Sequence, residues 1–394
     1  MTPAARLAAA IEILDRQQDG MPAEQALTGW ARAHRFAGSG DRAAIRDHVF
    51  TALRCLRSQG WRGGAGAGRA TGRQLVLGGL VAAGTDPATL FTGEGHAPPA
   101  LDPGEAAALA AAGAMPEAVA LDCPDWLLDP MRESLGADAA AVLGALRARA
   151  PVVLRANLAR TDRDGAIAAL AAAGIEGRAH PLAAAAIEVT AGATRLRTAA
   201  PYLDGLVELQ DAASQAVVEM LPLPAGGRIL DYCAGGGGKT LAMAARVAAR
   251  FTVHDADPGR MRDLPARAAR AGVKVALART PALAGQTFDL VLTDVPCSGS
   301  GSWRRAPEAK WTLTPARLAE LTGIQAGILD RAAALVRPGG VLAYATCSML
   351  SAENGAQVAA FLARCPGWRL EAERRLTPLD GGDGFYAAVL RAPA

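Results

Sequence analysis

Apolar residues recur along the first part of the chain at the spacing of an α-helix. The repeated positions are Leu7, Ile11, Leu14, Ile45, Val49 and Leu53. Residues three or four positions apart lie on one face of a helix, so the segment from Pro3 to about Leu56 is predicted to form amphipathic helices around a polar turn at residues 38–41. The glycine-rich tract at residues 60–72 then predicts a flexible turn or linker, and residues 93–105 predict a second loop.

The pattern changes between about Asp122 and Pro201. There it predicts, in order, a helix at 126–148, a strand at 151–159, a helix at 164–173 and short strands near Gly177 and Ile187. Strands mixed with helices over so short a segment indicate a small α/β module.

From Val207 onward, short apolar runs alternate with glycine-containing turns and helical segments. The predicted strands are residues 228–232, 251–255, 273–277, 288–294 and 339–346. This alternation is typical of a doubly wound, mostly parallel sheet, which binds its ligands beyond the carboxyl ends of the strands. We therefore predict an α/β fold with three domains, at residues 1–118, 119–205 and 206–394.

Composition narrows the class of protein. A chain of 394 residues is long enough for several domains, and no apolar run reaches the roughly 18 residues of a membrane span. The six cysteines are widely spaced without a CxxC pair, which argues for free thiols and against a zinc site. We expect a cytoplasmic protein, monomeric and without a metal.

Charge is informative mainly through its distribution. The net charge is only +3, but residues 1–75 hold 11 arginines against 6 acidic residues. Such an excess suits phosphate backbones and equally suits a solvated helical surface. Only three lysines occur, Lys239, Lys274 and Lys310, so a retained lysine is more informative here than usual.

The first chemical motif is a glycine-rich turn between a predicted strand and a helix. It reads Asp231-Tyr-Cys-Ala-Gly-Gly-Gly-Gly-Lys-Thr240. Glycines let the backbone approach a ligand, and a helix N-terminus offers free N–H groups. The spacing excludes a Walker loop, because that motif requires glycine at the position of Cys233.

Two acidic residues follow the second predicted strand, about 20 residues after the glycines. An acid there holds the ribose hydroxyls of a nucleoside in Rossmann-type folds. Asp255 is the better candidate, because Asp257 precedes Pro258 and is better placed to cap a helix.

Two cysteines follow neighbouring predicted strands. Cys297 lies in Asp294-Val-Pro-Cys-Ser-Gly-Ser-Gly301, and Cys347 lies in Tyr344-Ala-Thr-Cys-Ser348. Both strand ends point to the same edge of the sheet, so the two thiols are expected to converge on one substrate atom. Cys55, Cys123 and Cys365 are expected to be small buried hydrophobic residues.

Together these motifs resemble the RsmB/Sun (Fmu) family of bacterial rRNA cytosine carbon-5 methyltransferases, within the RsmB/NOP group. The matching segments are residues 209–215, 231–240, 294–301, 304–311, 344–348 with Glu353 and Asn354, and 382–390. The N-terminal helices, especially residues 40–54, resemble a shortened NusB-like RNA-binding domain. Residues 119–205 resemble the small module that precedes the catalytic domain in this family.

The resemblance implies a Rossmann-like class I domain that uses S-adenosylmethionine (SAM) to methylate cytosine in RNA, with small-subunit rRNA as the expected partner. It implies Cys347 as the nucleophile and Cys297 as the cysteine that assists product release. The implied SAM-binding residues are Cys233, Ala234, Gly235, Gly236, Gly237, Gly238, Lys239, Asp255 and Asp294.

The chemistry of cytosine methylation indicates two further catalytic residues, Asp294 and Lys310. A thiolate that adds to carbon 6 activates cytosine for methylation, and a carboxyl group on the base edge, assigned to Asp294, stabilises the activated ring. Lys310 is predicted to hold phosphate or polarise the base.

The chain departs from the family at two places. Gly235 and Gly236 stand where the family usually has Ala-Pro, and residues 278–281 lack the usual Asp near the adenine. Three alternatives remain open: a DNA-type enzyme with Cys297 as nucleophile, a small-molecule methyltransferase, and a silent RNA-binding factor.

Overall fold

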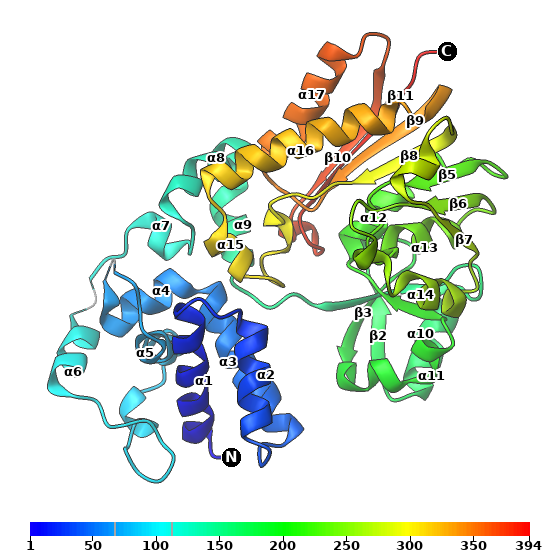
Figure 1. The fold of residues 1–394 in the computed structure, drawn as a ribbon. Coiled ribbons are helices and arrows are strands. Elements are labelled where there is room, and N and C mark those ends of the chain that lie inside the picture. The colour runs from blue at the N-terminus through cyan, green and yellow to red at the C-terminus, as the bar shows by residue number, and fades with distance from the viewer. Residues whose placement is uncertain (67, 112) are drawn as a thin grey trace. The chain divides into compact units, whose positions relative to one another are not determined.

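The computed structural model describes residues 1–66, 68–111 and 113–394, which form two compact units (Figure 1). The first, called the helical unit, comprises Met1–Arg132, Gly136–Arg149 and Trp303–Thr312. The second, called the α/β unit, comprises Glu133–Leu135, Ala150–Ser302 and Leu313–Ala394. In the described residues, no helix is long and apolar enough to cross a membrane.

The helical unit is built as the apolar spacing predicts. Its helices are α1 (Pro3–Gln18), α2 (Ala23–Ala33), α3 (Ser39–Arg54), α4 (Leu56–Gly60), α5 (Gly72–Ala82), α6 (Pro103–Ala110), α7 (Glu117–Ala120), most of α8 (Asp125–Leu135), α9 (Ala139–Ala145) and α15 (Glu308–Thr312). Helix α1 packs against α2, α3 and α5. Of the six repeated apolar positions, Ile11 is half-buried and the other five are buried in one core.

The first part of the glycine-rich tract packs against the helical core, which corrects the prediction of a flexible linker for residues 60–65. Residues Trp61–Ala65 form a π-helical turn against α5. A Cβ on Gly63 would lie 1.9 Å from the carbonyl oxygen of Gln74, and one on Gly78 would lie 1.8 Å from that of Gln59. The glycines therefore allow close backbone packing. Residue 67 of the tract lies outside the described residues.

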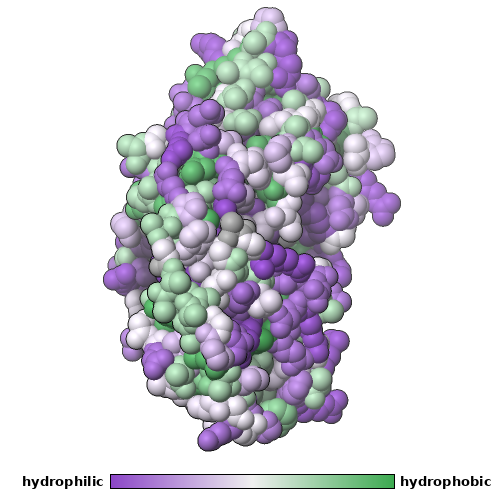
Figure 2. All heavy atoms as spheres, turned by 90° about the vertical axis from the view of Figure 1, so that its left-hand side faces the viewer, coloured by the Kyte–Doolittle hydropathy of each residue, from purple (hydrophilic) through white to green (hydrophobic). Residues whose placement is uncertain are grey.

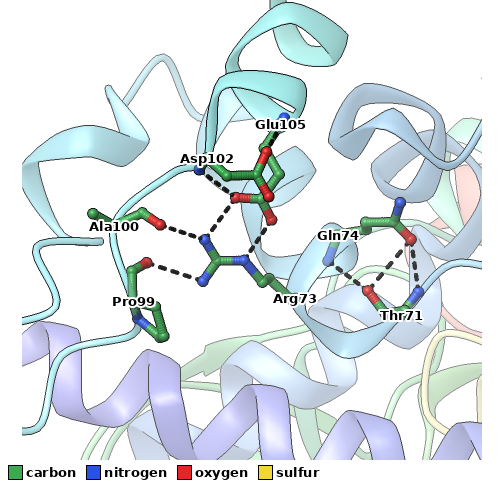
Figure 3. Close-up of polar contacts among 7 residues, drawn as sticks. All are labelled: Thr71, Arg73, Gln74, Pro99, Ala100, Asp102 and Glu105. Atoms are coloured by element: carbon green, nitrogen blue, oxygen red, sulfur yellow. Dashed lines mark hydrogen bonds and ion pairs between the residues drawn. The ribbon is translucent and has the colours of Figure 1, made fainter.

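The loop at residues 93–105 is held in place by one arginine (Figure 3). Arg73 on α5 pairs with Glu105 at 2.5 Å and donates to the carbonyls of Pro99 at 3.0 Å and Ala100 at 3.2 Å. Glu105 also completes a capping box with Asp102 at the start of α6.

On the face drawn in Figure 2, apolar residues lie in small groups among hydrophilic ones.

The helical unit extends past the predicted boundary at residues 118 and 119, because buried polar contacts join its later helices to α4. Asp122 is fully buried, and its carboxylate accepts from Ser58 N at 2.8 Å and from Ser58 Oγ at 2.7 Å. The Arg147 guanidinium lies 3.0 Å from the same carboxylate. Trp311, far along the chain, donates to the carbonyl of Leu53 at 2.7 Å.

The α/β unit begins with a four-stranded antiparallel sheet in the order β2-β3-β1-β4. Its elements are β1 (Val152–Ala156), α10 (Arg163–Ala172), β2 (Glu176–Ala179), β3 (Ala186–Ala191), α11 (Ala200–Leu203) and β4 (Val207–Leu209). The strands and the helix predicted between residues 151 and 191 are all present. Arg155 on β1 is buried and donates to the carbonyl of Gly238 at 2.8 Å, which connects this sheet to the glycine turn.

The second sheet has seven strands in the order β10-β11-β9-β8-β5-β6-β7. Its elements are α12 (Ala212–Glu219), β5 (Arg228–Asp231), α13 (Gly238–Ala244), β6 (Arg250–Val253), α14 (Leu264–Ala271), β7 (Val275–Leu277), β8 (Phe288–Asp294), α16 (Pro315–Ala333), β9 (Val336–Thr346), α17 (Gly355–Arg364), β10 (Arg369–Leu376) and β11 (Phe385–Arg391). Strands β5 to β9 are parallel, whereas β11 runs antiparallel between β9 and β10. The predicted doubly wound sheet is confirmed.

Apolar side chains cover both faces of this sheet. Ile229, Leu290 and Val341 belong to one core, and their neighbours Leu230, Val291 and Leu342 belong to the other. Successive residues of a strand point to opposite faces, so continuous apolar runs bury both faces. Because β5, β8 and β9 are parallel, their carboxyl ends lie at one edge of the sheet. At this edge Asp294 on β8 is opposite Ala345 on β9.

We expect Gly78→Ala to destabilise the helical unit by about 3 kcal/mol, because the added Cβ would overlap the carbonyl oxygen of Gln59. Gly29→Ala is the matched control on α2: nothing lies within 4 Å of its added Cβ, so we expect a gain of about 1 kcal/mol from helix propensity. Urea unfolding followed by tryptophan fluorescence reports mainly this unit, since five of the six tryptophans lie in it. Equal midpoints for both variants would contradict the close packing.

Candidate active site

The turn after β5 uses two glycines in a backbone conformation that other residues rarely adopt. Gly235 has φ +49° and Gly237 has φ +79°, and Gly237 caps α13. A Cβ on Gly237 would also lie 2.7 Å from Leu264, which packs under the turn. The four glycines place no side chain over the backbone of residues 235–238 where β5 meets α13, and of these Gly236 and Gly238 are half-buried. Cys233 and Ala234, at the start of the turn, pack against the neighbouring cores.

Asp231, the last residue of β5, is a buried carboxyl group with one incompletely satisfied oxygen. Its Oδ2 accepts from Thr240 Oγ1 at 2.6 Å, whereas its Oδ1 has no partner among the described residues. Burial raises the pKa of Asp231 to about 7. The strand end thus holds a buried acceptor able to bind a cationic donor.

Asp255 follows β6 and has the position predicted for a ribose-binding acid. It is 5% exposed, its Oδ2 accepts from Gly235 N at 3.0 Å, and its Oδ1 accepts from Asp257 N at 3.0 Å. Arg260 lies 3.4 Å away. These contacts fix the carboxylate beside the glycine turn. Asp257 caps the short helix Pro258–Met261 through Gly259 N, which confirms its predicted capping role.

Lys239 and Asp294 form an ion pair that joins the glycine turn to the end of β8. Lys239 Nζ lies 2.5 Å from Asp294 Oδ2 and 4.8 Å from the centre of the Phe385 ring. Burial lowers the pKa of Lys239, but the adjacent Asp294 carboxylate outweighs this effect and raises it. The lysine is therefore a buried cation that fixes the orientation of Asp294.

Cys297 and Cys347 converge as their strand positions predict. Their sulfur atoms lie 3.4 Å apart, within hydrogen-bond distance. Gly301 N donates to the carbonyl of Cys347 at 2.9 Å, and a Cβ on Gly301 would lie 1.9 Å from the carbonyl oxygen of Gly384. Gly301 therefore lets the loop after β8 lie against both the carbonyl of Cys347 and the backbone of Gly384, which precedes β11.

The two thiols differ in acidity. The hydrogen bond from Cys297 lowers the pKa of Cys347 against the opposing effect of burial, and Lys239 contributes in the same direction. The same hydrogen bond, together with burial, raises the pKa of Cys297 well above its usual value. Cys347 is thus the more readily ionised thiol and Cys297 the proton donor.

Two family models match this chain. The model for the 16S rRNA methyltransferase RsmB/F matches residues 218–391, and that for the RsmF/B-like ferredoxin-like domain matches residues 123–194. A ribosomal RNA small subunit methyltransferase B of Klebsiella pneumoniae is 36% identical over 288 residues, and one of Vibrio vulnificus is 36% identical over 281. The chain belongs to the RsmB/F methyltransferase family.

The match to the curated relatives is partial. It covers 68% of this chain and 65% and 66% of the length of those two relatives. Among solved structures, PH0851 has a TM-score of 0.77 at 21% identity over 99% of each chain. NSun6 from Pyrococcus horikoshii, solved with SFG, has a TM-score of 0.61 at 19% identity over 69% of this chain and 98% of its own. These structures support the fold.

Lys310 belongs to a different unit from the other predicted catalytic residues, which lie in the α/β unit. It belongs to the helical unit, is 2% exposed, and donates to the carbonyl of Arg54 at 3.3 Å. Burial lowers its pKa to about 8. Lys310 is buried there because the segment Trp303–Thr312 belongs to the helical unit, where Trp311 donates to the carbonyl of Leu53. Its role in holding phosphate or polarising the base stays a prediction.

The remaining cysteines have no reactive setting. Cys55 and Cys123 are buried in the helical unit, as predicted, and Cys365 is half-buried against a core of the α/β unit. Burial raises the pKa of Cys123 to about 11, and it also raises the pKa of Cys233. All six cysteines are free thiols. Among the described residues, no group of three or more His, Cys, Asp or Glu side chains could hold a metal.

Sequence reasoning assigned no role to the polar residues behind the cysteines. Ser298, Ser300, Ser348, Glu353 and Asn354 are all buried and hydrogen-bonded to one another or to the two cysteine loops. The only sequence signal was their presence in the motif segments shared with the family. Their function depends on contacts between segments about 50 residues apart.

Cys297→Ala should shift the alkylation of Cys347 to higher pH. The variant removes the S–H donor that favours the Cys347 thiolate, so its pKa should rise by about one unit, the equivalent of one hydrogen bond to a charged group. At a fixed pH below the pKa, less thiolate remains and modification by iodoacetamide slows. Peptide mass spectrometry across a pH series measures this rate. Cys365→Ala is the control, and an unshifted profile in Cys297→Ala would rule out the shared proton.

Proposed function

We propose that this chain transfers a methyl group from SAM to carbon 5 of a cytosine in RNA, in small-subunit rRNA, through a covalent bond between Cys347 and the base. The observation that carries the proposal is the pair of thiols 3.4 Å apart, which follow the neighbouring strands β8 and β9. The names of the relatives, ribosomal RNA small subunit methyltransferase B, support the choice of rRNA.

The residues around the glycine turn fit SAM. Asp231 offers a buried oxygen without a donor, which suits the ammonium of the methionine part, and Asp255 offers a fixed carboxylate for the ribose hydroxyls. The glycines at residues 235–238 carry no side chains that would block the approach of a ligand to their backbone. NSun6, of the same fold, was solved with SFG, which agrees with a ligand site of this kind. When bound, SAM supplies an electrophilic methyl group on a positively charged sulfur.

Cys347 activates the base. Its thiolate forms a bond to carbon 6, and the electrons of the 5,6 double bond move so that carbon 5 becomes nucleophilic. Asp294, held by Lys239, accepts a hydrogen bond from the exocyclic amino group and orients the ring. The base must be unstacked to reach these residues, which favours looped or unfolded RNA over a duplex.

Cys297 completes the reaction. After methylation, carbon 5 must lose its proton and the bond between Cys347 and carbon 6 must break. Cys297 gives its proton to the departing Cys347 sulfur and takes up the carbon 5 proton in exchange, which re-forms the double bond. The sulfur of Cys297 lies 3.4 Å from the sulfur that must leave, which is close enough for this proton transfer.

Asp255→Ala should weaken SAM binding by about 1.5 to 3 kcal/mol, roughly 10-fold to 150-fold, through lost hydrogen bonds to a charged group. Calorimetric titration measures the change. Asp257→Ala is the control, because this substitution removes the cap on Pro258–Met261 but leaves the backbone N–H that binds Asp255. A dissociation constant unchanged in Asp255→Ala, or weakened equally in both variants, would assign the ribose to another residue.

Cys347→Ala should abolish both methyl transfer and the protein–RNA adduct, because no activated ring can form without the nucleophile. Cys297→Ala should instead accumulate an adduct that survives denaturing electrophoresis when SAM is present, since attack remains possible and release is slowed. Labelled RNA and labelled SAM in parallel reactions measure both products.

The reverse pattern, an adduct in Cys347→Ala and none in Cys297→Ala, would make Cys297 the nucleophile, as in DNA cytosine methyltransferases. Activity retained in Cys347→Ala without any adduct would exclude covalent catalysis. Cys365→Ala serves as the matched cysteine control in the same unit.

We also propose that the helical unit binds RNA phosphates. Its first 75 residues carry the arginine excess, and Arg32 and Arg42 line a pocket of about 390 Å³ with α2 on one side and α3 on the other. The two substitutions Arg32→Gln and Arg42→Gln together should weaken RNA binding and reduce its salt slope by about two.

Fluorescence titration with RNA at several salt concentrations tests this proposal. Arg16→Gln, which replaces an exposed arginine on α1 outside the pocket, is the control. Removing residues 1–115 would be a poorer test, because it would also expose the core around Trp311. An unchanged salt slope in the double variant would leave the pocket without a role in RNA binding.

A further inference from the structure

Glu353 is a fully buried carboxylate between the two cysteine loops. It lies in the short helical turn Ser351–Glu353 after β9 and is 0% exposed. Its oxygens accept from Ser298 N at 2.8 Å, Ser298 Oγ at 2.5 Å, Ser348 Oγ at 2.5 Å and Gln325 Nε2 at 3.0 Å. No ion pair to Glu353 occurs among the described residues. The carboxylate is therefore satisfied by neutral donors alone.

These donors tie Glu353 to both cysteines. Ser298 directly follows Cys297, and Ser348 directly follows Cys347. The hydroxyls of the two serines also lie 3.3 Å apart, and Ser300 Oγ lies 3.1 Å from Ser348 Oγ. One side chain thus connects the loop after β8 to the loop after β9, immediately behind the sulfur atoms.

The position of Glu353 is itself fixed from several sides. Tyr344 donates to its backbone carbonyl at 2.6 Å. Gln325 on α16 donates both to its carboxylate and to the carbonyl of Pro296 at 3.0 Å. The next residue, Asn354, accepts from Thr346 at 2.6 Å and donates to the carbonyl of Ser348 at 2.9 Å. Such a network leaves the carboxylate little freedom to move.

A buried carboxylate without a cationic partner is costly, and an apolar residue would stabilise a core more simply. We propose that Glu353 is the positioning residue of the two-cysteine site: by binding the serine beside each cysteine it holds the thiols in contact and makes Cys347 the nucleophile, while Cys297 keeps its proton. This inference rests on the proposed function, in which the two cysteines have different roles.

The negative charge of Glu353 contributes to the difference in acidity between Cys297 and Cys347. The hydrogen bond to Cys347 and burial are the main causes of the raised pKa of Cys297, and the negative charges of Cys347 and Glu353 add to them. The groups facing the other sulfur differ: Lys239 favours the Cys347 thiolate, and Asp294 opposes it. Tyr344 also lies close enough for its pKa to respond to Cys297 and Glu353. The negative charge of Glu353 therefore favours the proton on Cys297.

The test compares the ratio of Cys347 to Cys297 alkylation in the wild-type protein and in variants of Glu353, with so little reagent that each molecule is modified at one cysteine at most. The reduced full-length protein is treated with limiting iodoacetamide, and the ratio of Cys347 to Cys297 modification is measured by peptide mass spectrometry over a pH series. Glu353→Gln keeps the shape and removes the charge, so we expect the ratio to fall about tenfold, the effect of one unit of relative acidity. Glu208→Gln, which replaces another buried carboxylate in the same unit, should leave the ratio unchanged.

A ratio in Glu353→Gln equal to that of the wild type, in protein with the same thermal midpoint, would overturn the proposal. So would an equal fall in Glu208→Gln, because it would show a general effect of loosening the unit. If Glu353→Gln does not fold, Ser298→Ala replaces it: this variant keeps the charge and cuts the hydroxyl link, and the ratio should fall about fivefold, the equivalent of one hydrogen bond. An unchanged ratio there would also overturn the proposal.

The experiment needs neither RNA nor SAM. Its result is therefore separate from the proposed function, which fails if the wild-type protein transfers no methyl group. A second measurement connects the two: Glu353→Gln should lower kcat for methyl transfer more than it changes KM for RNA, because the residue acts on the sulfur atoms and touches no substrate.

Discussion

The contact between the thiols of Cys297 and Cys347 is the interaction on which the proposed chemistry depends, and it depends in turn on how the α/β unit is built. It requires β8 and β9 to be adjacent and parallel, with Asp294 opposite Ala345, so that both loops leave the sheet at one edge. It is also supported by glycine at position 301, where a side chain would overlap the backbone of Gly384 and displace the loop that donates to the carbonyl of Cys347. Both faces of the sheet are buried, so β8 and β9 cannot shift relative to each other without disturbing a packed core. The sheet therefore holds the two cysteine loops in fixed positions.

Charge at this edge is arranged around the sulfur atoms. Asp231, Asp255 and Asp294 bring three carboxyl groups to neighbouring strand ends, and Lys239 is the cation buried among them that pairs with Asp294. A site rich in carboxylates would normally oppose a thiolate. Here the thiol of Cys297 and the ammonium of Lys239 lower the pKa of Cys347, which favours its thiolate at the place where the base is proposed to bind.

The two units contribute different physical properties. The α/β unit places titratable groups with short, buried contacts, whereas the helical unit carries exposed arginines over an apolar core. The segment Trp303–Thr312 belongs to the helical unit although it directly follows the cysteine loop in sequence. This covalent connection means that the loop of Cys297 leads directly into the core of the helical unit.

The sequence by itself determined the helices of residues 3–56 and the order of strands β1 to β3 and β5 to β9, because the apolar periodicities were clear and glycine turns marked the strand ends. It did not predict β10 and β11, and it predicted one helix at residues 126–148 where the structure has α8 and α9. It also placed Asp255, Cys297 and Cys347 at the correct edge, since parallel strands end together. Three features depended on tertiary structure. The glycine tract proved to be packed, Lys310 proved to lie in the helical core, and Glu353 proved to connect both cysteine loops. Each rests on contacts between segments distant in the chain, and local patterns of apolar and polar residues carry no record of such partners.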